Sequence, residues 1–97
     1  MGDLLTLAKQ CLSIVSSATA KDTEITMLIK AAIADLTRQG INVDTTNDLV
    51  KCAIVMYVKA NFGMVDIKDK ELAQRTYILL CKNLGLSSEY LEVESNG

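Results

Sequence analysis

Residues 47–62 read NDLVKCAIVMYVKANF and include the longest unbroken hydrophobic stretch of the chain, residues 52–58. Asn47 or Thr46 can cap a helix at the start of this segment, and the helix is expected to end near Phe62. Apolar side chains would then surround most of the helix, leaving a polar side with little more than two lysines and an asparagine. A helix this apolar is normally covered on most sides. We therefore predict that it is the hub of a small bundle, or that another subunit covers part of it.

Two further helices are predicted before this segment. The first spans residues 4–15, with Asp3 as its N-cap, and a small polar loop at residues 16–21 follows it. The second spans residues 22–39, with Asp22 as its N-cap and Gly40 at the position where a left-handed residue ends a helix. Its apolar residues recur at helical spacing and predict one buried face, formed by Ile25, Leu28, Ile29, Ala32, Ile33 and Leu36.

A fourth helix is predicted to begin at Asp66 or Asp69 and to end at Leu84, before Gly85. Its expected core face consists of Leu72, Thr76, Leu79, Leu80 and Leu84. Residues 86–97, LSSEYLEVESNG, show no clear pattern and are predicted to form an irregular C-terminal tail. Residues 1–97 are thus expected to form a single all-α domain, a bundle of about four helices with a long loop between the second and the third.

The composition excludes several kinds of chemistry. The 97 residues include no histidine, so histidine-dependent catalytic triads and histidine-ligated zinc sites are ruled out. Cys11, Cys52 and Cys81 are too far apart in the sequence to form a CxxC pair, and the glycines form no phosphate-binding motif. We therefore predict no catalytic residue, no bound metal and no cofactor, and a protein that is not an enzyme.

Charge and hydropathy restrict the partners of the chain. Its 10 basic and 12 acidic residues give a net charge of −2, without the basic run that is typical of proteins that grip nucleic acid. Asp3 stands where a signal peptide would carry a basic residue, and no hydrophobic stretch approaches the roughly 18 residues of a membrane span. We expect a soluble, cytoplasmic protein with no membrane contact.

The second and third helices leave one alternative open, a small DNA-binding regulator of the helix-turn-helix type. The turn between them would have about seven residues, against the usual three or four. The third helix begins with acidic and amide residues before it becomes apolar, and Lys51 and Lys59 are the bases that DNA binding would use. A generic helical protein-interaction module is a further alternative.

Three parts of the chain carry residues that suit contact with another subunit or protein. The loop at residues 41–46 contains two apolar residues, the third helix holds two of the four aromatic residues, and the tail holds another. Aromatic residues are enriched at interfaces relative to the rest of a protein surface. The candidate interface residues are Ile41, Asn42, Val43, Asp44, Tyr57, Lys59, Phe62, Tyr90, Leu91 and Val93.

Residues 53–63, AIVMYVKANFG, resemble the central helix of the small head–tail connector (adaptor) proteins of tailed phages and prophages. Residues 25–36, ITMLIKAAIADL, resemble the helix that precedes it in that family, and residues 82–90, KNLGLSSEY, resemble the segment after the last helix. The similarity extends over residues 3–90. It lies in the order and spacing of these segments more than in any one of them.

The resemblance implies a structural virion protein that is not an enzyme. It implies a ring of identical subunits that docks below the portal of the DNA-filled head, extends the channel and offers a platform to stopper or tail-completion proteins. Double-stranded DNA would pass through this ring without specific binding, and the protein would move from the host cytoplasm to the head–tail junction. Residues 16–21, 40–48 and 86–97 are implied as contact regions, without roles for single residues.

Overall fold

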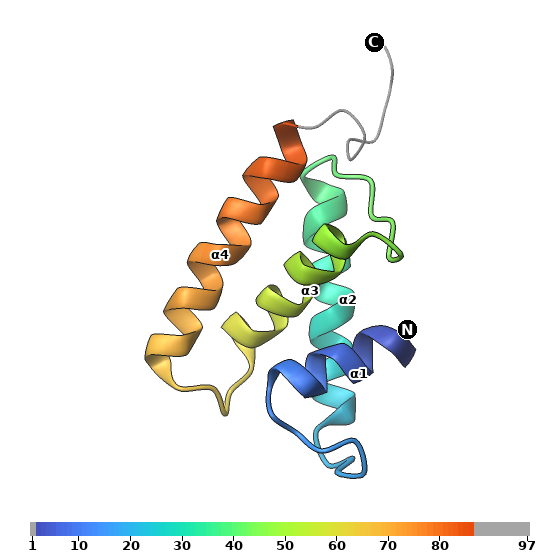
Figure 1. Cartoon of the computed structure of the whole chain (residues 1–97), viewed down its shortest axis with the longest axis vertical. Helices are drawn as coiled ribbons and strands as arrows, with labels where there is room; N and C mark the ends of the chain where they lie inside the picture. The colour runs from blue at the N-terminus through green and yellow to red at the C-terminus, as the bar shows by residue number, and fades with distance from the viewer. Residues whose placement is uncertain (1, 87–97) are drawn as a thin grey trace.

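The computed structural model describes residues 2–86, with side chains from Leu4 onward. Four α-helices follow one another along the chain, α1 (Gly2–Cys11), α2 (Asp22–Arg38), α3 (Asp48–Asn61) and α4 (Ile67–Leu86), as Figure 1 shows. Residues 2–86 contain no β-strand. The predicted all-α fold with a long loop between α2 and α3 is confirmed. The predicted tail lies outside the described residues except for Leu86, which ends α4.

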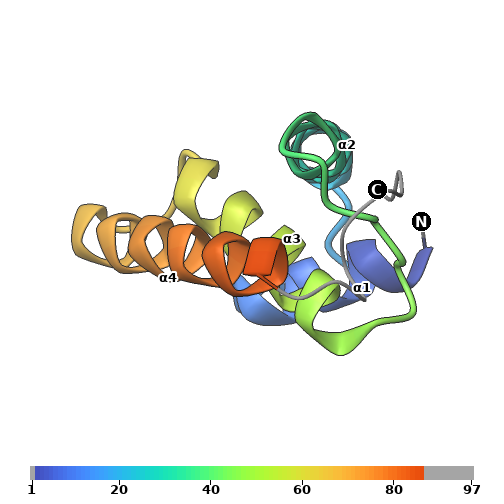
Figure 2. The same cartoon turned by 90° about the horizontal axis from the view of Figure 1, so that it is seen from above.

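α3 is the centre of the bundle and contacts each of the other three helices. Two perpendicular views show α4 running alongside α3 on one side, with α1 and α2 placed on its other sides (Figures 1 and 2). Five residues of α3 are buried: Val50, Ala53, Ile54, Val55 and Val58. The prediction that this apolar helix is the hub of the bundle is confirmed.

Local signals in the sequence set both ends of the loop between α2 and α3. Gly40 has a φ of 82°, and the N–H groups of Gly40 and Ile41 donate to the carbonyls of Thr37 (2.9 Å) and Leu36 (3.1 Å). This is a Schellman motif, and Ile41, the residue after Gly40, packs in the core. At the other end, Asn47 Oδ1 accepts hydrogen bonds from the N–H groups of Leu49 (2.9 Å) and Val50 (3.1 Å). The predicted glycine stop and the Asn47 cap are both confirmed.

The face of α2 that packs into the core follows the predicted stripe. Ile25, Ile29, Ala32 and Leu36 are buried, and Leu28 and Ile33 are half-buried against the same core. The expected Asp22 cap is wrong, because Lys21 occupies the cap position and Asp22 is already the first residue of the helix.

Asp22 instead forms an ion pair with Lys9 of α1. The two charged atoms are 2.8 Å apart, and Lys9 is only 4% exposed. Lys9 Nζ also donates to the carbonyl of Ser16 at 3.1 Å, so one buried ammonium holds the connecting loop and the start of α2 together. A buried charge is tolerated only when it is paired in this way.

α1 is shorter than predicted. It ends at Cys11 rather than near Val15, and Ser13 adopts a φ of 61°, a left-handed conformation that ends the helix. The helix begins at Gly2, so Asp3 lies inside its first turn and not before it. The Asp3 side chain, which the predicted cap requires, lies outside the described side chains.

The predicted core face of α4 is only partly correct, because Leu84 and Leu80 pack in the core as predicted but two of the other leucines do not. Leu72 and Leu79 are exposed, and the buried residues are Ala73, Tyr77, Cys81 and Leu84, with Leu80 half-buried. The predicted face and the buried face are both apolar at helical spacing. Only the buried face contains Tyr77, which contacts α2 and α3.

The start of α4 was predicted correctly, but its end was not. Asp66 Oδ2 accepts from the N–H of Lys68 at 3.1 Å, so the Asp66 cap is confirmed. The Gly85 stop is wrong: α4 continues to Leu86, and a Cβ at Gly85 would meet no other atom, so this position does not require glycine.

Replacing a buried and an exposed apolar residue tests this assignment of the core. Ile54→Ala in α3 should lower the free energy of unfolding by about 2–5 kcal/mol, because it leaves a cavity in the hub. The matched control Leu79→Ala in α4 should change it by less than about 0.5 kcal/mol, because that side chain is already in solvent. Urea denaturation followed by circular dichroism gives both values, and equal losses would contradict the assignment.

Candidate subunit and partner interfaces

The outer face of α4 carries a row of exposed leucines. Leu72, Leu79 and Leu86 are seven residues apart and are 60%, 60% and 86% exposed. Seven residues are close to two helical turns, so the three side chains lie on nearly one line along the helix. This line is on the side of α4 away from Ala73, Tyr77 and the α3 contact. Exposed leucines in a regular row are typical of a surface that another protein covers.

A second row of bases runs beside the leucines. Lys68, Arg75 and Lys82 each precede one of the leucines by four residues, which places each base next to its leucine on the helix surface. All three are exposed, and none of them forms an ion pair within residues 4–86. The outer face of α4 is therefore apolar along one line and basic along the next.

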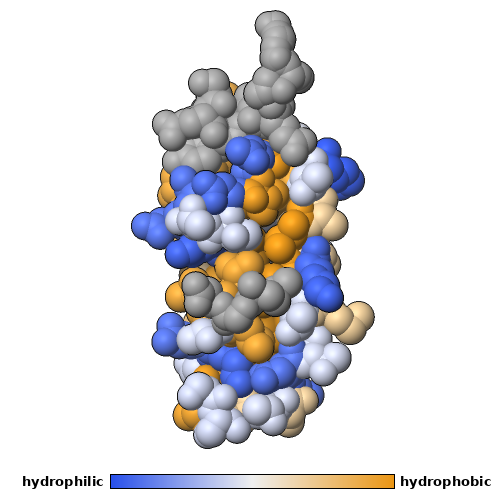
Figure 3. Space-filling model, turned by 90° about the vertical axis from the view of Figure 1, so that its right-hand side faces the viewer, coloured by the Kyte–Doolittle hydropathy of each residue, from blue (hydrophilic) through white to orange (hydrophobic). Residues whose placement is uncertain are grey.

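The opposite side of the molecule is also apolar in part. Figure 3 looks at this side, where apolar side chains form a strip flanked by polar ones. The elements that lie here are the N-terminal end of α1 and the loop between α2 and α3 (Figure 1). Val43 in the loop is half-buried and packs against the core. The subunit thus has apolar surface on two sides that face in different directions.

The structure describes seven of the ten predicted interface residues, and their exposure differs. Ile41 and Phe62 are buried in the subunit's own core, so their side chains are not at the surface. Tyr57 and Lys59 are half-buried on α3. In the loop, Asn42 and Asp44 are exposed and Val43 is half-buried. The tail residues Tyr90, Leu91 and Val93 lie outside the described residues.

Asp44 gives the loop between α2 and α3 a fixed local shape. Its Oδ1 accepts hydrogen bonds from the N–H (2.9 Å) and the hydroxyl (2.6 Å) of Thr46. These bonds favour the ionised carboxylate and lower the pKa of Asp44 below its usual value. The loop therefore presents Asn42 and Asp44 from a folded turn.

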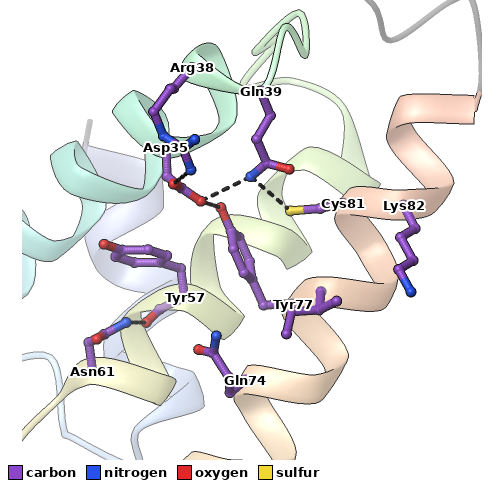
Figure 4. A pocket seen from close by; sticks show the side chains of 10 residues that line it. Asp35, Arg38, Gln39, Tyr57, Asn61, Gln74, Tyr77, Cys81 and Lys82 are labelled. Carbon is purple, nitrogen blue, oxygen red and sulfur yellow. Dashed lines mark hydrogen bonds and ion pairs between the residues drawn. The ribbon is translucent and has the colours of Figure 1, made fainter.

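A polar cluster joins the end of α2 to the middle of α4 (Figure 4). Asp35 accepts hydrogen bonds from the hydroxyl of Tyr77 and from Arg38 Nη2, both at 2.5 Å, and from Gln39 Nε2 at 3.0 Å. The ring of Tyr77 also packs edge-on against Tyr57 of α3, with 5.3 Å between the ring centroids. One tyrosine of α4 thus contacts both of the longer helices beside it.

The donors around Asp35 set its charge state. Hydrogen bonds from Tyr77 and then from Arg38 lower the pKa of the Asp35 carboxyl, so it remains ionised at neutral pH. Burial and the same hydrogen bond raise the pKa of Tyr77 far above its usual value, so its hydroxyl keeps the proton that it donates. The pair is therefore a stable charge-assisted hydrogen bond over the physiological pH range.

These groups surround an open hollow of about 560 Å³, which Gln74, Ile78 and Lys82 of α4 also line. This cluster was not predicted from the sequence, and neither Tyr77 nor Asp35 is among the predicted interface residues. The two residues are 42 positions apart, and nothing in the local pattern around either one pairs them.

A comparison with protein families identifies the chain. The sequence profile of a family described as phage connector protein matches residues 4–90, nearly the whole chain. The chain belongs to the phage connector protein family. No curated protein and no solved structure gives a significant match.

Membership in the phage connector family makes this chain a structural protein of a phage that assembles with other virion proteins. Among the described residues, no helix combines the length and the apolar composition that crossing a bilayer requires. For a connector protein, the exposed leucine row of α4 and the strip on the opposite side are the natural candidates for contact with such partners.

The link between Tyr77 and Asp35 predicts a pH-dependent stability. Tyr77→Phe should lower the free energy of unfolding at pH 7 by about 1–3 kcal/mol, because the bond reaches an ionised acceptor. The folded-state pKa of Asp35 is lowered, so its stabilising effect is present above the unfolded pKa near 3.8 and is lost as pH falls through the folded value. The difference between wild type and Tyr77→Phe should therefore shrink below pH 4.

The matched control for this prediction is Tyr57→Phe, which removes a hydroxyl from the other ring of the pair. Its effect on the free energy of unfolding should be small and should not change between pH 7 and pH 3. Urea denaturation at both pH values measures the two variants. A loss that is equal for both tyrosines, or independent of pH for Tyr77, would contradict the assignment.

Proposed function

We propose that this connector protein is the subunit of a ring that docks below the portal of the phage head. In this role the ring extends the DNA channel and offers a platform to stopper or tail-completion proteins. The observation that carries the proposal, beside the family match, is the pair of exposed apolar surfaces on opposite sides of one subunit. In a closed ring each subunit has a neighbour on two sides and uses a different patch toward each of them, so it needs interaction surface on both sides.

The charge of the chain suits a channel through which DNA moves. The net charge is −2. Each DNA phosphate that a basic residue bound would add affinity for DNA and so oppose the movement of DNA along the channel. We further propose that the protein works by shape and packing and not by catalysis. The polar cluster around Asp35 supports this role, because its groups bond to one another and fix α4 in place.

The position of α3 weighs against a helix-turn-helix regulator. A recognition helix must present its side chains to base edges in the major groove. In this fold α3 is the buried hub, and nine residues, 39–47, separate it from α2. The α3 residues that remain exposed are Asp48, Leu49, Cys52 and Asn61, and none of them is a base, so this helix offers little to DNA.

Reconstitution with the portal protein encoded by the same phage tests the proposal. The purified chain should form a closed ring on the portal, which negative-stain microscopy shows as an added layer and native mass spectrometry shows as a fixed number of subunits. A chain that remains strictly monomeric and does not bind the portal would contradict the proposal. Sequence-selective DNA binding at low salt would instead favour the regulator.

A further inference from the structure

The row of leucines and the row of bases on the outer face of α4 determine which kind of segment can bind there. From Lys68 to Leu86 the rows alternate base and leucine, and 14 residues separate the first leucine from the third. At a rise of about 1.5 Å per residue, the leucine row is about 21 Å long. A segment that fits this surface must be about as long, and it must combine acidic with apolar side chains.

One segment of this chain has that composition. Residues 89–94 read EYLEVE, so three acids are interleaved with Tyr90, Leu91 and Val93, and no base follows Lys82. In an extended conformation, six residues span about 20 Å, which is close to the length of the leucine row. Within that length, the three acids and three apolar residues match the three bases and three leucines of the face in number, so the segment and the face are complementary in charge, hydropathy and length.

We propose that the outer face of α4 binds residues 89–94 of a neighbouring copy of the chain. The inference rests on the proposed ring, in which each subunit would hold the C-terminal segment of the next one. The contact joins two different patches, so it repeats around a ring and leaves no unmatched copy.

Docking on the same chain is less favourable for a geometric reason. α4 extends to Leu86, the last leucine of the row, and residues 87 and 88 alone separate it from the acidic segment. The chain would have to reverse completely within those two residues to place Glu89 beside Lys82. A segment from a neighbouring subunit has no such constraint.

The charges also predict how the contact responds to salt. The three bases are exposed, so their attraction to the acids is screened as ionic strength rises. Ring formation should therefore weaken between 50 mM and 500 mM NaCl. The leucines would sustain part of the contact at high salt, because apolar burial does not depend on charge.

A charge exchange between two full-length variants tests the proposal. The first variant, Arg75→Glu/Lys82→Glu, changes the face of α4, and the second, Glu89→Lys/Glu92→Lys, changes the segment. Each variant alone should lose ring formation on the portal at least tenfold, measured by native mass spectrometry at 100 mM salt. An equimolar mixture should recover it, because each segment then meets a face of opposite charge on the other chain.

Controls separate this result from general charge effects and from misfolding. Lys21→Glu/Lys30→Glu makes the same change in net charge on and just before α2, and it should form rings like wild type. When this control is mixed with the second variant, the second variant should still enter rings less often than wild type. The control keeps a basic α4 face, which repels the basic segment of the second variant. Circular dichroism should show unchanged helicity for every variant, since all the replaced residues of the described part are exposed.

The remaining outcomes overturn either the inference or the proposed function, and they differ. If the combined four-fold variant forms rings but the mixture does not, the segment binds its own α4 and the inference is wrong. If the segment variant loses portal binding while the α4 variant keeps it, the segment contacts the portal and the inference is again wrong. Both outcomes are compatible with a ring of wild-type subunits. A wild-type chain that forms no ring on the portal would instead contradict the proposed function.

Discussion

The fold depends on the burial of one helix, α3. Val50, Ala53, Ile54 and Val58 are fully buried, and the other three helices each contact α3 from a different direction. Burial of this aliphatic surface supplies the main driving force that a chain of this size has available, because the sequence contains few aromatic residues. With α1 and α2 on its other sides, α3 offers α4 a single contact surface. One side of α4 therefore remains outside the core.

This geometry explains why α4 exposes leucines. The side of α4 that meets α3 carries Ala73, Tyr77 and Leu84, and Tyr77 alone can place its ring against Tyr57 and its hydroxyl on Asp35. The charge-assisted bond to Asp35 selects between two faces that are similar in hydropathy. Leu72 and Leu79 are then left on the surface, where they cannot stabilise the free subunit. A partner that covers them would recover that stabilisation, which fits the connector role of the family.

The features that sequence analysis predicted correctly are local ones. The Asn47 cap, the Gly40 stop and the stripe of α2 each depend on residues within a few positions of one another. Two local predictions, the Asp22 cap and the Gly85 stop, were wrong, but the features that were not predicted at all depend on residues far apart in the chain. The ion pair of Lys9 with Asp22 and the bond of Tyr77 to Asp35 cross between helices, and the orientation of α4 follows from the second of these. Hydrophobic periodicity could not choose that orientation, because both faces of α4 satisfy it.

A cryo-electron microscopy map of the chain assembled on its portal tests the central claim most directly. The account predicts that Leu72, Leu79 and Leu86 lie against an adjacent subunit in the ring, with α3 still buried as it is in the single chain. A closed ring in which this face of α4 points into solvent, or in which α4 has left α3, would contradict the account.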